Sequence, residues 1–464
     1  MFEKTKSYIG KVVSKIFPEE SKKEKIEDAT SKIMKDSIKL WSDMYEDKAK
    51  WLKDEELESY NLASSIASEI ARLVTIEMIS EVTGKTDEEG KGINNKRAEF
   101  LNDQYQNVID DIRIETEYAA AKGGMVFKPY VENEKIYIDY VQADNFVPIK
   151  FNGSGDLIAA TFPDTIIKNN KTYTREEYHE LMPNGIYYIS NESFVDGKPC
   201  ELTDLEEWED LEAELNIKGL EKPLFSYFKM PLANNKDCNS NLGVSVYSKA
   251  VDIIKQVDKQ YNKILWEYEG TELAIDVSLD MLKNGEMPEG KKRIFRKLDV
   301  DTKDDSFYEV FSPEIRDESL YNGLNKLLQA VEYRVGLAYG TISDMQVVEK
   351  TATEIASSKQ RSYSTVVDIQ KALRVALEHL LYAMDWYTTY YKLAPEGDYE
   401  VSFDFDDSIV VNVKEEQMIM LNEVNSGLIK PEYYLQKRYG LSEQQAKDML
   451  PNMNDNNNPD DGIE

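Results

Sequence analysis

The chain has 464 residues, of which 41% are hydrophobic, and it carries a formal net charge of −31 with a pI near 4.6. This length allows two to four domains, and the apolar fraction is high enough for packed cores, which excludes a disordered protein. The acidic balance excludes an ordinary high-affinity nucleic-acid binder, because such affinity comes from many lysine and arginine contacts to phosphate. It does not exclude a protein that touches DNA without holding it.

Cysteine usage and hydropathy restrict the class of protein further. Cys200 and Cys238 are the only cysteines, so a disulfide framework is excluded and a reducing compartment is favoured. No apolar run reaches the roughly 18 residues that a membrane span needs. We therefore expect no membrane partner.

Residues 1–21 read as a short basic amphipathic arm. Apolar residues such as Ile9, Val12 and Ile16 recur among lysines. The segment lacks the continuous apolar core of a signal peptide. We interpret it as an arm that packs on its own or a neighbouring subunit, with a membrane-surface anchor as the alternative.

Helical patterns dominate the first quarter of the chain. A charged helical stretch covers residues 22 to about 50. A clear apolar stripe predicts a helix over Asn61–Thr83 that ends at Gly84, and another predicts a helix over Asn94–Lys122 that ends at Gly123.

From Met125 to about Met230 the hydrophobic pattern has a period of two. Asn152-Gly153 and Asn184-Gly185 separate alternating runs, and Asn-Gly is a strong hairpin signal because both central residues need positive φ. The pattern predicts an antiparallel meander. It also predicts an acidic helical excursion over Leu202–Glu214 before a last strand near Pro223–Met230.

The next stretch predicts two helices of similar length around a strand-rich insert. The first helix is expected over Leu242–Gly270, where apolar residues recur every three or four positions, and the second carries Leu320 through Val335. The insert lies between them and ends near Pro313. Such a hairpin with a small head is unusual for an enzyme core.

A very long helix is expected over Thr351–Lys392. About 40 helical residues span about 60 Å, which is too long for one small core, so the helix should bridge domains or pack on copies of itself. A strand or hairpin is expected over Tyr399–Val413. Short helices follow over Lys414–Leu450, and a disordered tail begins near Asn452.

The sequence offers no convincing catalytic, cofactor or metal site. Gly285–Lys291 fits the spacing of a phosphate-binding loop, but Lys292 stands where Ser or Thr would be needed to bind Mg²⁺. We interpret it as a turn before a basic strand. His179 and His379 are far apart, and the two cysteines have no C-x-x-C partner. We expect no cofactor and no enzymatic activity.

Three basic or loop features remain as functional candidates. Lys255, Lys259 and Lys263 form a stripe at i, i+4 and i+8, which is either a functional face or a solvated face with local pairs to Asp252 and Asp258.

The densest basic cluster lies in the insert. It is either a charged edge strand protected from aggregation or a docking surface for an acidic partner or phosphate. Its residues are Lys291, Lys292, Arg293, Arg296 and Lys297.

A loop follows the second helix of the hairpin. Gly340 breaks the helical pattern, and Thr351 with Glu354 forms a capping box that starts the long helix. The loop is either a simple connector or a mobile element at the tip of two long helices.

Five segments spread over the chain carry a resemblance to the portal proteins of tailed bacteriophages, closest to the portal family of phages that infect Gram-positive bacteria. They are Leu62–Glu69, Tyr118–Tyr130, Asn241–Gly270, Gly290–Asp299 and Gly340–Tyr363.

The resemblance implies an α+β portal fold: a helical wing with an antiparallel β meander, a two-helix stem, a small α/β clip, a long spanning helix and a helical crown. The implied boundaries are an arm at 1–21, wing at 22–241, stem helices at 242–270 and 313–339, clip at 271–312, tunnel loop at 340–350, long helix and strand at 351–413, crown at 414–450 and tail at 451–464.

The resemblance also implies a homo-dodecameric ring at one capsid vertex. Double-stranded DNA passes through its channel without sequence-specific contacts during packaging and ejection. The implied partners are the major capsid protein, the scaffolding protein, the terminase large subunit and the head–tail connector, the last two docking on the clip through its basic cluster. The location is the virion, and the host cytoplasm during assembly. The residues expected in the channel are Lys255, Lys259, Lys263, Thr341, Ser343, Met345, Gln346 and Lys350.

Two alternatives stay open from the sequence. One is a structural or adaptor protein of the virion that is not a portal. The other is a nucleotide-dependent hydrolase that uses the Gly285 loop.

Overall fold

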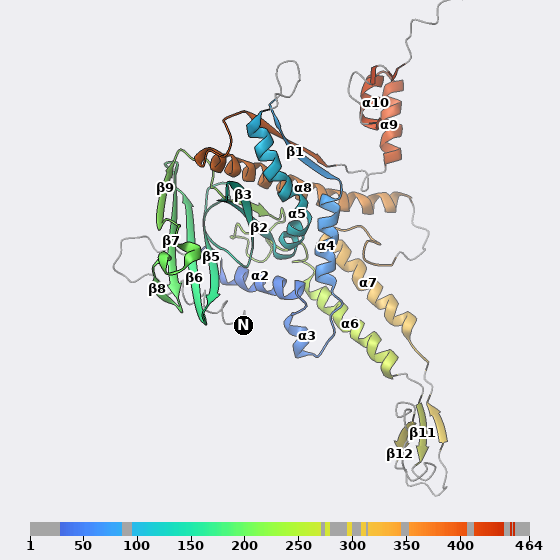
Figure 1. Ribbon diagram of the computed structural model, residues 1–464. Coiled ribbons are helices and arrows are strands. Elements are labelled where there is room, and N and C mark those ends of the chain that lie inside the picture. Colours follow the sequence, from blue (N-terminus) through green and yellow to red (C-terminus); the bar gives the residue numbers. More distant parts are fainter. Residues whose placement is uncertain are drawn as a thin grey trace, which may run out of the picture.

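The computed structural model shows a body of helices and sheets from which a long helical hairpin projects (Figure 1). A small sheet lies at the far end of the hairpin, and a pair of short helices stands at the opposite end of the molecule. This mixture confirms the α+β class. The structure describes residues 28–85, 95–270, 274–278, 295–298, 308–311, 314–344, 352–405, 413–439, 446–447 and 449–450.

Two of the N-terminal helices begin at residues whose side chains cap them, and one of these two ends at a glycine. The Ser31 side chain accepts a hydrogen bond from the Met34 N–H at 3.2 Å, and the Asn95 side chain accepts one from the Ala98 N–H at 2.8 Å. Gly123 ends the last of these helices with φ of 94°, a conformation that glycine adopts without strain. The helices are α2 (Lys32–Tyr45), α3 (Lys50–Asp54), α4 (Leu62–Thr75) and α5 (Lys96–Lys122).

The helix predicted over Asn61–Thr83 is wrong beyond Thr75. Residues Met78–Gly84 form strand β1, which pairs antiparallel with β14 (Tyr399–Phe405). The β-branched residues of β1, such as Val82, favour a strand. Its partner lies more than 300 positions away, so the local pattern does not reveal the pairing.

The predicted antiparallel meander is confirmed, and it divides into two sheets. One sheet has the order β10-β2-β3, and the other has the order β4-β5-β6-β7-β8 with β9 on β7. The expected acidic helix is instead a pair of 3₁₀ turns, η1 (Leu202–Asp204) and η2 (Glu206–Trp208). The strands are β2 (Gly124–Glu132), β3 (Lys135–Gln142), β4 (Val147–Phe151), β5 (Leu157–Lys168), β6 (Lys171–Leu181), β7 (Ile186–Val195), β8 (Lys198–Cys200), β9 (Glu214–Lys218) and β10 (Ser226–Lys229).

Both hairpins that the Asn-Gly pairs predict are present, because β4 pairs antiparallel with β5 and β6 with β7, but their loops are longer than two residues. Asn133 and Glu134 form a two-residue turn between β2 and β3, with φ of 50° and 60°. The Asn152-Gly153 and Asn184-Gly185 pairs instead lie in longer loops, residues 152–156 and 182–185. The predicted hairpins are therefore confirmed, while the two-residue form of these two turns is not.

The long helix α8 (Ala352–Tyr390) crosses the body and joins its parts (Figure 1). It packs against α4 and against strands β2 and β10. The Ser226 hydroxyl donates to the Ala376 carbonyl at 2.6 Å. The buried Arg97 side chain at the start of α5 pairs with Asp385 near the end of α8, at 2.6 Å. α8 therefore links α4, α5 and the sheet that contains β2 and β10.

The helical hairpin starts later than the sequence predicts. Helix α6 begins at Val251, and the preceding residues 242–250 are a buried non-helical segment apart from the exposed Lys249. The Val246 N–H donates to the Ala120 carbonyl at 3.0 Å. A Cβ built on Gly243 would lie 2.0 Å from the Gly123 carbonyl oxygen. These contacts hold the segment against the end of α5, which overrides its helical periodicity.

The projecting parts follow the predicted order. β11 pairs parallel with β12 and antiparallel with β13, so β12, which includes Arg296 and Lys297, is an edge strand of this small sheet. Pro431 starts α10, as its position predicts. The elements are α6 (Val251–Gly270), β11 (Ala274–Ser278), β12 (Phe295–Leu298), β13 (Tyr308–Phe311), α7 (Asp317–Val335), α9 (Val413–Asn425) and α10 (Pro431–Tyr439).

We expect Gly243→Ala to lower the free energy of unfolding by about 2 kcal/mol or more, because the new methyl group would overlap backbone atoms that have no room to move. Chemical denaturation measures the loss. Gly153→Ala is the matched control, since a Cβ there meets nothing within 4 Å and its effect should stay within about 0.5 kcal/mol. Equal stabilities of the two variants would contradict the close crossing.

Candidate functional site

The candidate site is the hairpin of α6 and α7, called here the stem, together with the segment Gly340–Asp344 that follows α7. Polar contacts tie the two helices near the body and in the middle of the hairpin. The Arg334 guanidinium donates to the Lys249 carbonyl at 3.0 Å near the body, and the Gln260 amide donates to the Leu320 carbonyl at 3.0 Å in the middle. The stem is therefore a defined pair of helices within one subunit.

The outer end of the stem is closed by an ion pair. The Arg316 guanidinium donates to both carboxylate oxygens of Glu267, at 3.0 and 2.7 Å, and the Arg316 backbone N–H adds a third bond at 3.2 Å. These bonds lower the pKa of Glu267 below its usual value. The bidentate geometry fixes the point at which the chain returns from the small sheet.

Two of the three predicted stem lysines make a contact that the sequence does not suggest. Lys259 and Lys255 form ion pairs with the two carboxylate oxygens of Glu55, at 2.7 and 3.1 Å. Glu55 directly follows α3, and the two lysines lower its pKa below the usual value. Lys263 is exposed, and no ion pair involving it is found within the described ranges.

The expected local pair with Asp258 is replaced by a different contact. Asp258 is buried, and its carboxylate accepts hydrogen bonds from the Trp51 indole at 2.9 Å and the Tyr60 N–H at 3.0 Å. Burial raises its pKa above the usual value. Asp258 therefore anchors the α3 region to the stem, while the lysines on the same helix reach Glu55.

A buried carboxylate organises the segment after α7. Glu332 has no exposed surface, and it accepts hydrogen bonds from the Ile342 N–H at 2.7 Å and the Ser343 N–H at 2.9 Å. The Ser343 hydroxyl adds a bond at 2.8 Å and the Gly340 N–H one at 3.3 Å. Backbone N–H groups that converge on a carboxylate bind it strongly.

A second polar side chain extends this arrangement by one residue. The Asn325 amide accepts from the Asp344 N–H at 2.9 Å and donates to the Asp344 carbonyl at 3.3 Å. Thr341 is held locally, because its hydroxyl donates to the Ala338 carbonyl at 2.7 Å. The first part of the predicted tunnel loop, Gly340–Asp344, is thus fixed to α7.

The structure brings the predicted channel residues only partly together. Thr341 and Ser343 lie beside α7, whereas Met345, Gln346 and Lys350 lie outside the described residues. In the basic cluster of the insert, Arg296 and Lys297 belong to β12. Lys291, Lys292 and Arg293 lie outside the described ranges, as does the Gly285 loop.

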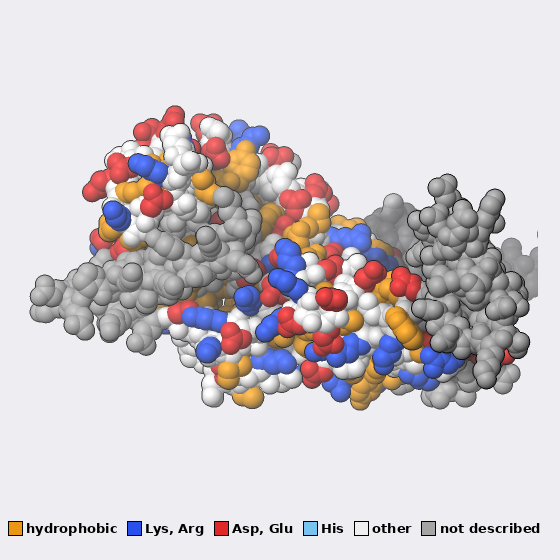
Figure 2. All heavy atoms as spheres, turned by 90° about the horizontal axis from the view of Figure 1, so that it is seen from below, with side chains coloured by type: hydrophobic (Ala, Val, Ile, Leu, Met, Phe, Trp, Pro, Cys, Tyr) orange, Lys and Arg blue, Asp and Glu red, His pale blue; other side chains and the backbone are white. Residues whose placement is uncertain are grey.

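The rest of the surface offers no competing chemical centre in the part of the chain that the structure describes. Within that part, no cluster of three His, Cys, Asp or Glu residues could hold a metal ion. No described helix is both long and apolar enough to cross a bilayer. The face in Figure 2 carries basic, acidic and hydrophobic side chains intermixed, without a single charged stripe.

Comparison with known proteins identifies the family. A model of the phage portal proteins described as SPP1 Gp6-like matches residues 23–458, which is most of the chain. The chain therefore belongs to this family. It is a phage portal protein, a structural component of the virion.

Solved structures also match the chain, and one of them is a chain in the structure described as "Neck of native GTA particle computed with C12 symmetry", with a TM-score of 0.42 and 9% sequence identity. The similarity covers 81% of this chain and 89% of that chain. No curated protein matches the sequence.

The sequence alone does not point to Glu332, Asn325 or Glu55. They are ordinary surface-type residues in helical patterns, and the chain has 87 acidic residues among which no single one stands out. The one available signal is that Glu332 falls on the apolar stripe of α7, beside the buried Val331 and Val335. A carboxylate at a core position indicates a specific partner.

We expect Glu332→Ala to destabilise the protein by about 2–4 kcal/mol, because it leaves buried N–H groups without an acceptor. Hydrogen exchange at Ile342 and Ser343 should accelerate, and thermal unfolding should occur earlier. Glu318→Ala, at an exposed position in the first turn of α7, is the control and should change neither quantity. Unchanged exchange at Ile342 and Ser343 would refute the anchoring role of Glu332.

Proposed function

We propose that twelve copies of the chain form a ring, and that the stem and the loop at 340–350 line a channel for double-stranded DNA. The observation that carries this proposal is the aromatic surface of the outer stem. Trp266 is 66% exposed, Tyr321 49% and Tyr268 42%. Exposed aromatic groups on a projecting hairpin indicate a surface that another protein covers.

Other copies of the same chain are the simplest partners that could bury the exposed faces of the stem. A two-helix hairpin buries only the helix faces that meet, so lateral neighbours are needed to bury the others. Contacts between two different faces of identical subunits either close into a ring or continue as a filament. A ring around a central passage suits a portal protein, which holds a unique position in the capsid.

The charge of the chain agrees with DNA that passes and does not stay bound. Each lysine contact to phosphate strengthens binding in a salt-dependent way and slows movement. A chain with a net charge of −31 offers few such contacts. Screening over about 8 Å at physiological salt allows the acidic outer body to coexist with DNA in the channel.

We also propose that the insert at 271–312 is the clip, which docks the terminase large subunit during packaging and later the head–tail connector. Support comes from its position at the far end of the stem and from the basic cluster in its sequence (Figure 1). The major capsid and scaffolding proteins would contact the wing. The resemblance of the five sequence segments favours the portal type of phages from Gram-positive hosts.

Ring assembly should depend on the outer stem. We expect Trp266→Ser to leave the subunit folded, because the side chain is mostly exposed, and to shift the protein from rings to smaller species in mass photometry and negative-stain images. Ile167→Ser removes a similarly exposed side chain, 64% accessible, from β5 in the wing and should leave rings intact. Rings that form normally with Trp266→Ser would contradict the proposed lateral contact.

DNA passage should depend on Lys263 more cleanly than on the other stem lysines. Reversing Lys255 or Lys259 would also break the contact with Glu55, whereas Lys263 has no such contact among the described residues. We expect Lys263→Glu to reduce the DNA packaged per capsid. Lys218→Glu, on β9, is the control. Normal packaging with Lys263→Glu would remove this residue from the channel.

Docking at the clip should depend on its basic strand. We expect simultaneous reversal of Arg293, Arg296 and Lys297 to weaken binding of the terminase large subunit or the connector to assembled rings, because the partner surface would lose its opposite charges. Binding is measured on immobilised rings. Loss of the rings, or undiminished binding, would count against the docking role.

A further inference from the structure

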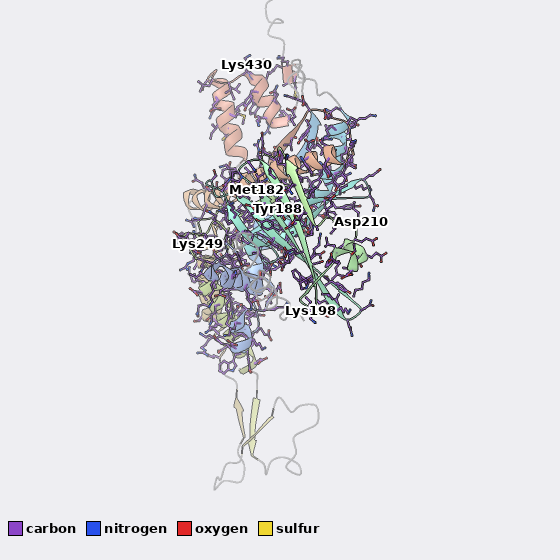
Figure 3. All side chains as sticks on the ribbon, turned by 90° about the vertical axis from the view of Figure 1, so that its left-hand side faces the viewer. Met182, Tyr188, Lys198, Asp210, Lys249 and Lys430 are labelled. Atoms are coloured by element: carbon purple, nitrogen blue, oxygen red, sulfur yellow. The ribbon has the colours of Figure 1, made fainter. Side chains whose placement is uncertain are left out.

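The wing contains a cavity that the portal function does not explain. Its volume is about 1130 Å³, and it lies between the β2–β3 strands, the inner face of β5–β7, the end of α8 and the segment that joins β8 to β9. Figure 3 shows Asp210, on that joining segment, on the side of the body opposite Lys249.

The cavity is strongly acidic. Seven carboxylates line it against two cations, and two of the seven, Asp144 and Glu207, pair with Lys122 and Lys168 from outside the lining. Both cations are already paired: Lys128 with Glu177 at 2.8 Å, and Arg175 with Asp164 at 3.5 Å. Asp210 and Glu212 are exposed at the lining, and neither makes an ion pair within the described part of the chain. The unbalanced negative charge of the cavity is therefore concentrated at Asp210 and Glu212.

Glu177, another carboxylate that lines the cavity, is also held in its anionic form. Burial alone would raise the pKa of Glu177, but Lys128 and the hydrogen bond from His179 hold it well below its usual value. Protonation does not relieve the acidity here at neutral pH. A ligand that brings positive charge is the chemical complement of this site.

The wall formed by α8 is aromatic. Trp386 stacks on Tyr390 with ring centroids 4.8 Å apart, and Tyr387 stacks on Tyr391 at 6.3 Å. Tyr390 and Tyr391 remain 51% and 52% exposed. Aromatic faces next to carboxylates bind ammonium groups and also accept apolar side chains. The complementary ligand is thus a basic segment with an apolar face.

The chain itself contains such a segment. Residues 2–17 carry four lysines and one glutamate, and their apolar residues recur at positions 9, 12, 13, 16 and 17, a spacing that predicts one apolar face if the segment is helical. These residues lie outside the described ranges. Their net charge of +3 is opposite to that of the cavity.

The described chain begins beside this cavity. The Ala29 N–H donates to the Pro148 carbonyl on β4 at 2.9 Å, and Asn145, three residues before Pro148, lines the cavity. The ten residues between positions 17 and 28 reach roughly 33–36 Å when extended. The segment is therefore tethered within reach of the cavity in its own subunit.

We propose that residues 2–17 dock in the wing cavity of the same subunit, with their lysines against Asp210 and Glu212 and their apolar face on the aromatic wall of α8. This inference concerns the wing and is independent of the proposed DNA channel.

Limited trypsin digestion of the full-length protein tests the docking, because docked residues are protected. We expect Asp210→Lys with Glu212→Lys to accelerate cleavage after Lys11 and Lys15 by about tenfold or more, the factor that corresponds to about 1.4 kcal/mol of lost binding. The matched control is Glu206→Lys with Glu209→Lys, which makes the same charge change in the same segment at exposed positions that do not line the cavity. Equal cleavage rates in the two double variants would overturn the proposal.

A disulfide trap decides whether the segment belongs to the same subunit. In a chain with Cys200→Ser and Cys238→Ser, the substitutions Lys15→Cys and Asp210→Cys should yield an intrachain disulfide, seen as a monomer of altered mobility on a non-reducing gel. Lys15→Cys with Lys198→Cys is the control and should not cross-link at a comparable rate. A dimer-sized product would assign the segment to a neighbouring subunit, and the absence of any disulfide would remove it from the cavity; either result overturns the proposal.

Discussion

The direction of the stem depends on one backbone crossing in the body. Gly243 approaches the Gly123 carbonyl so closely that no side chain fits between them. Gly123 also ends α5 and leads into β2. One point therefore joins α5, the β10-β2-β3 sheet and the segment that precedes α6. Nearby, the Tyr247 hydroxyl donates to the Trp41 carbonyl at 2.8 Å, and both residues are fully buried. These contacts fix the segment before α6 and so set the direction in which the stem leaves the body.

Both ends of α7 are held by carboxylates, but the two arrangements have different consequences. At the outer end, the buried Glu267 side chain meets the exposed Arg316, and the solvent around Arg316 weakens the contribution of this ion pair. At the inner end, the fully buried Glu332 is satisfied by N–H and O–H donors of Gly340–Ser343. Breaking the second costs more, because the carboxylate cannot return to water without opening the core. The loop after α7 thus has a rigid first part, and any movement must start beyond Asp344.

The elements that could be predicted from the sequence are those stabilised by their own pattern. Helices α5, α7 and α8 carry long apolar stripes, and their predicted bounds agree with the structure to within a few residues. β1 and residues 242–250 were mispredicted because distant partners, β14 and the α5–β2 junction, decide their conformation. In the candidate site, too, features set by local spacing could be predicted and contacts with distant residues could not. The lysine stripe on α6 was visible as a spacing, whereas Glu55 lies 200 positions before Lys255, and no local pattern could connect them.

The contact of Lys255 and Lys259 with Glu55 lowers the positive charge that the stem presents. The sequence presents three lysines in a row on α6, which suggests a continuous positive track. In the folded subunit one carboxylate neutralises much of the charge of two of them, and Lys263 remains the exposed member of the stripe. In the proposed ring each subunit would then offer one such lysine. Because the salt-dependent affinity for DNA grows with the number of phosphate contacts, a sparse ring of single charges guides a polyanion while opposing its movement only weakly. The pairing with Glu55 is a structural tie between α3 and the stem, and in the proposed channel it would also limit how tightly DNA is held.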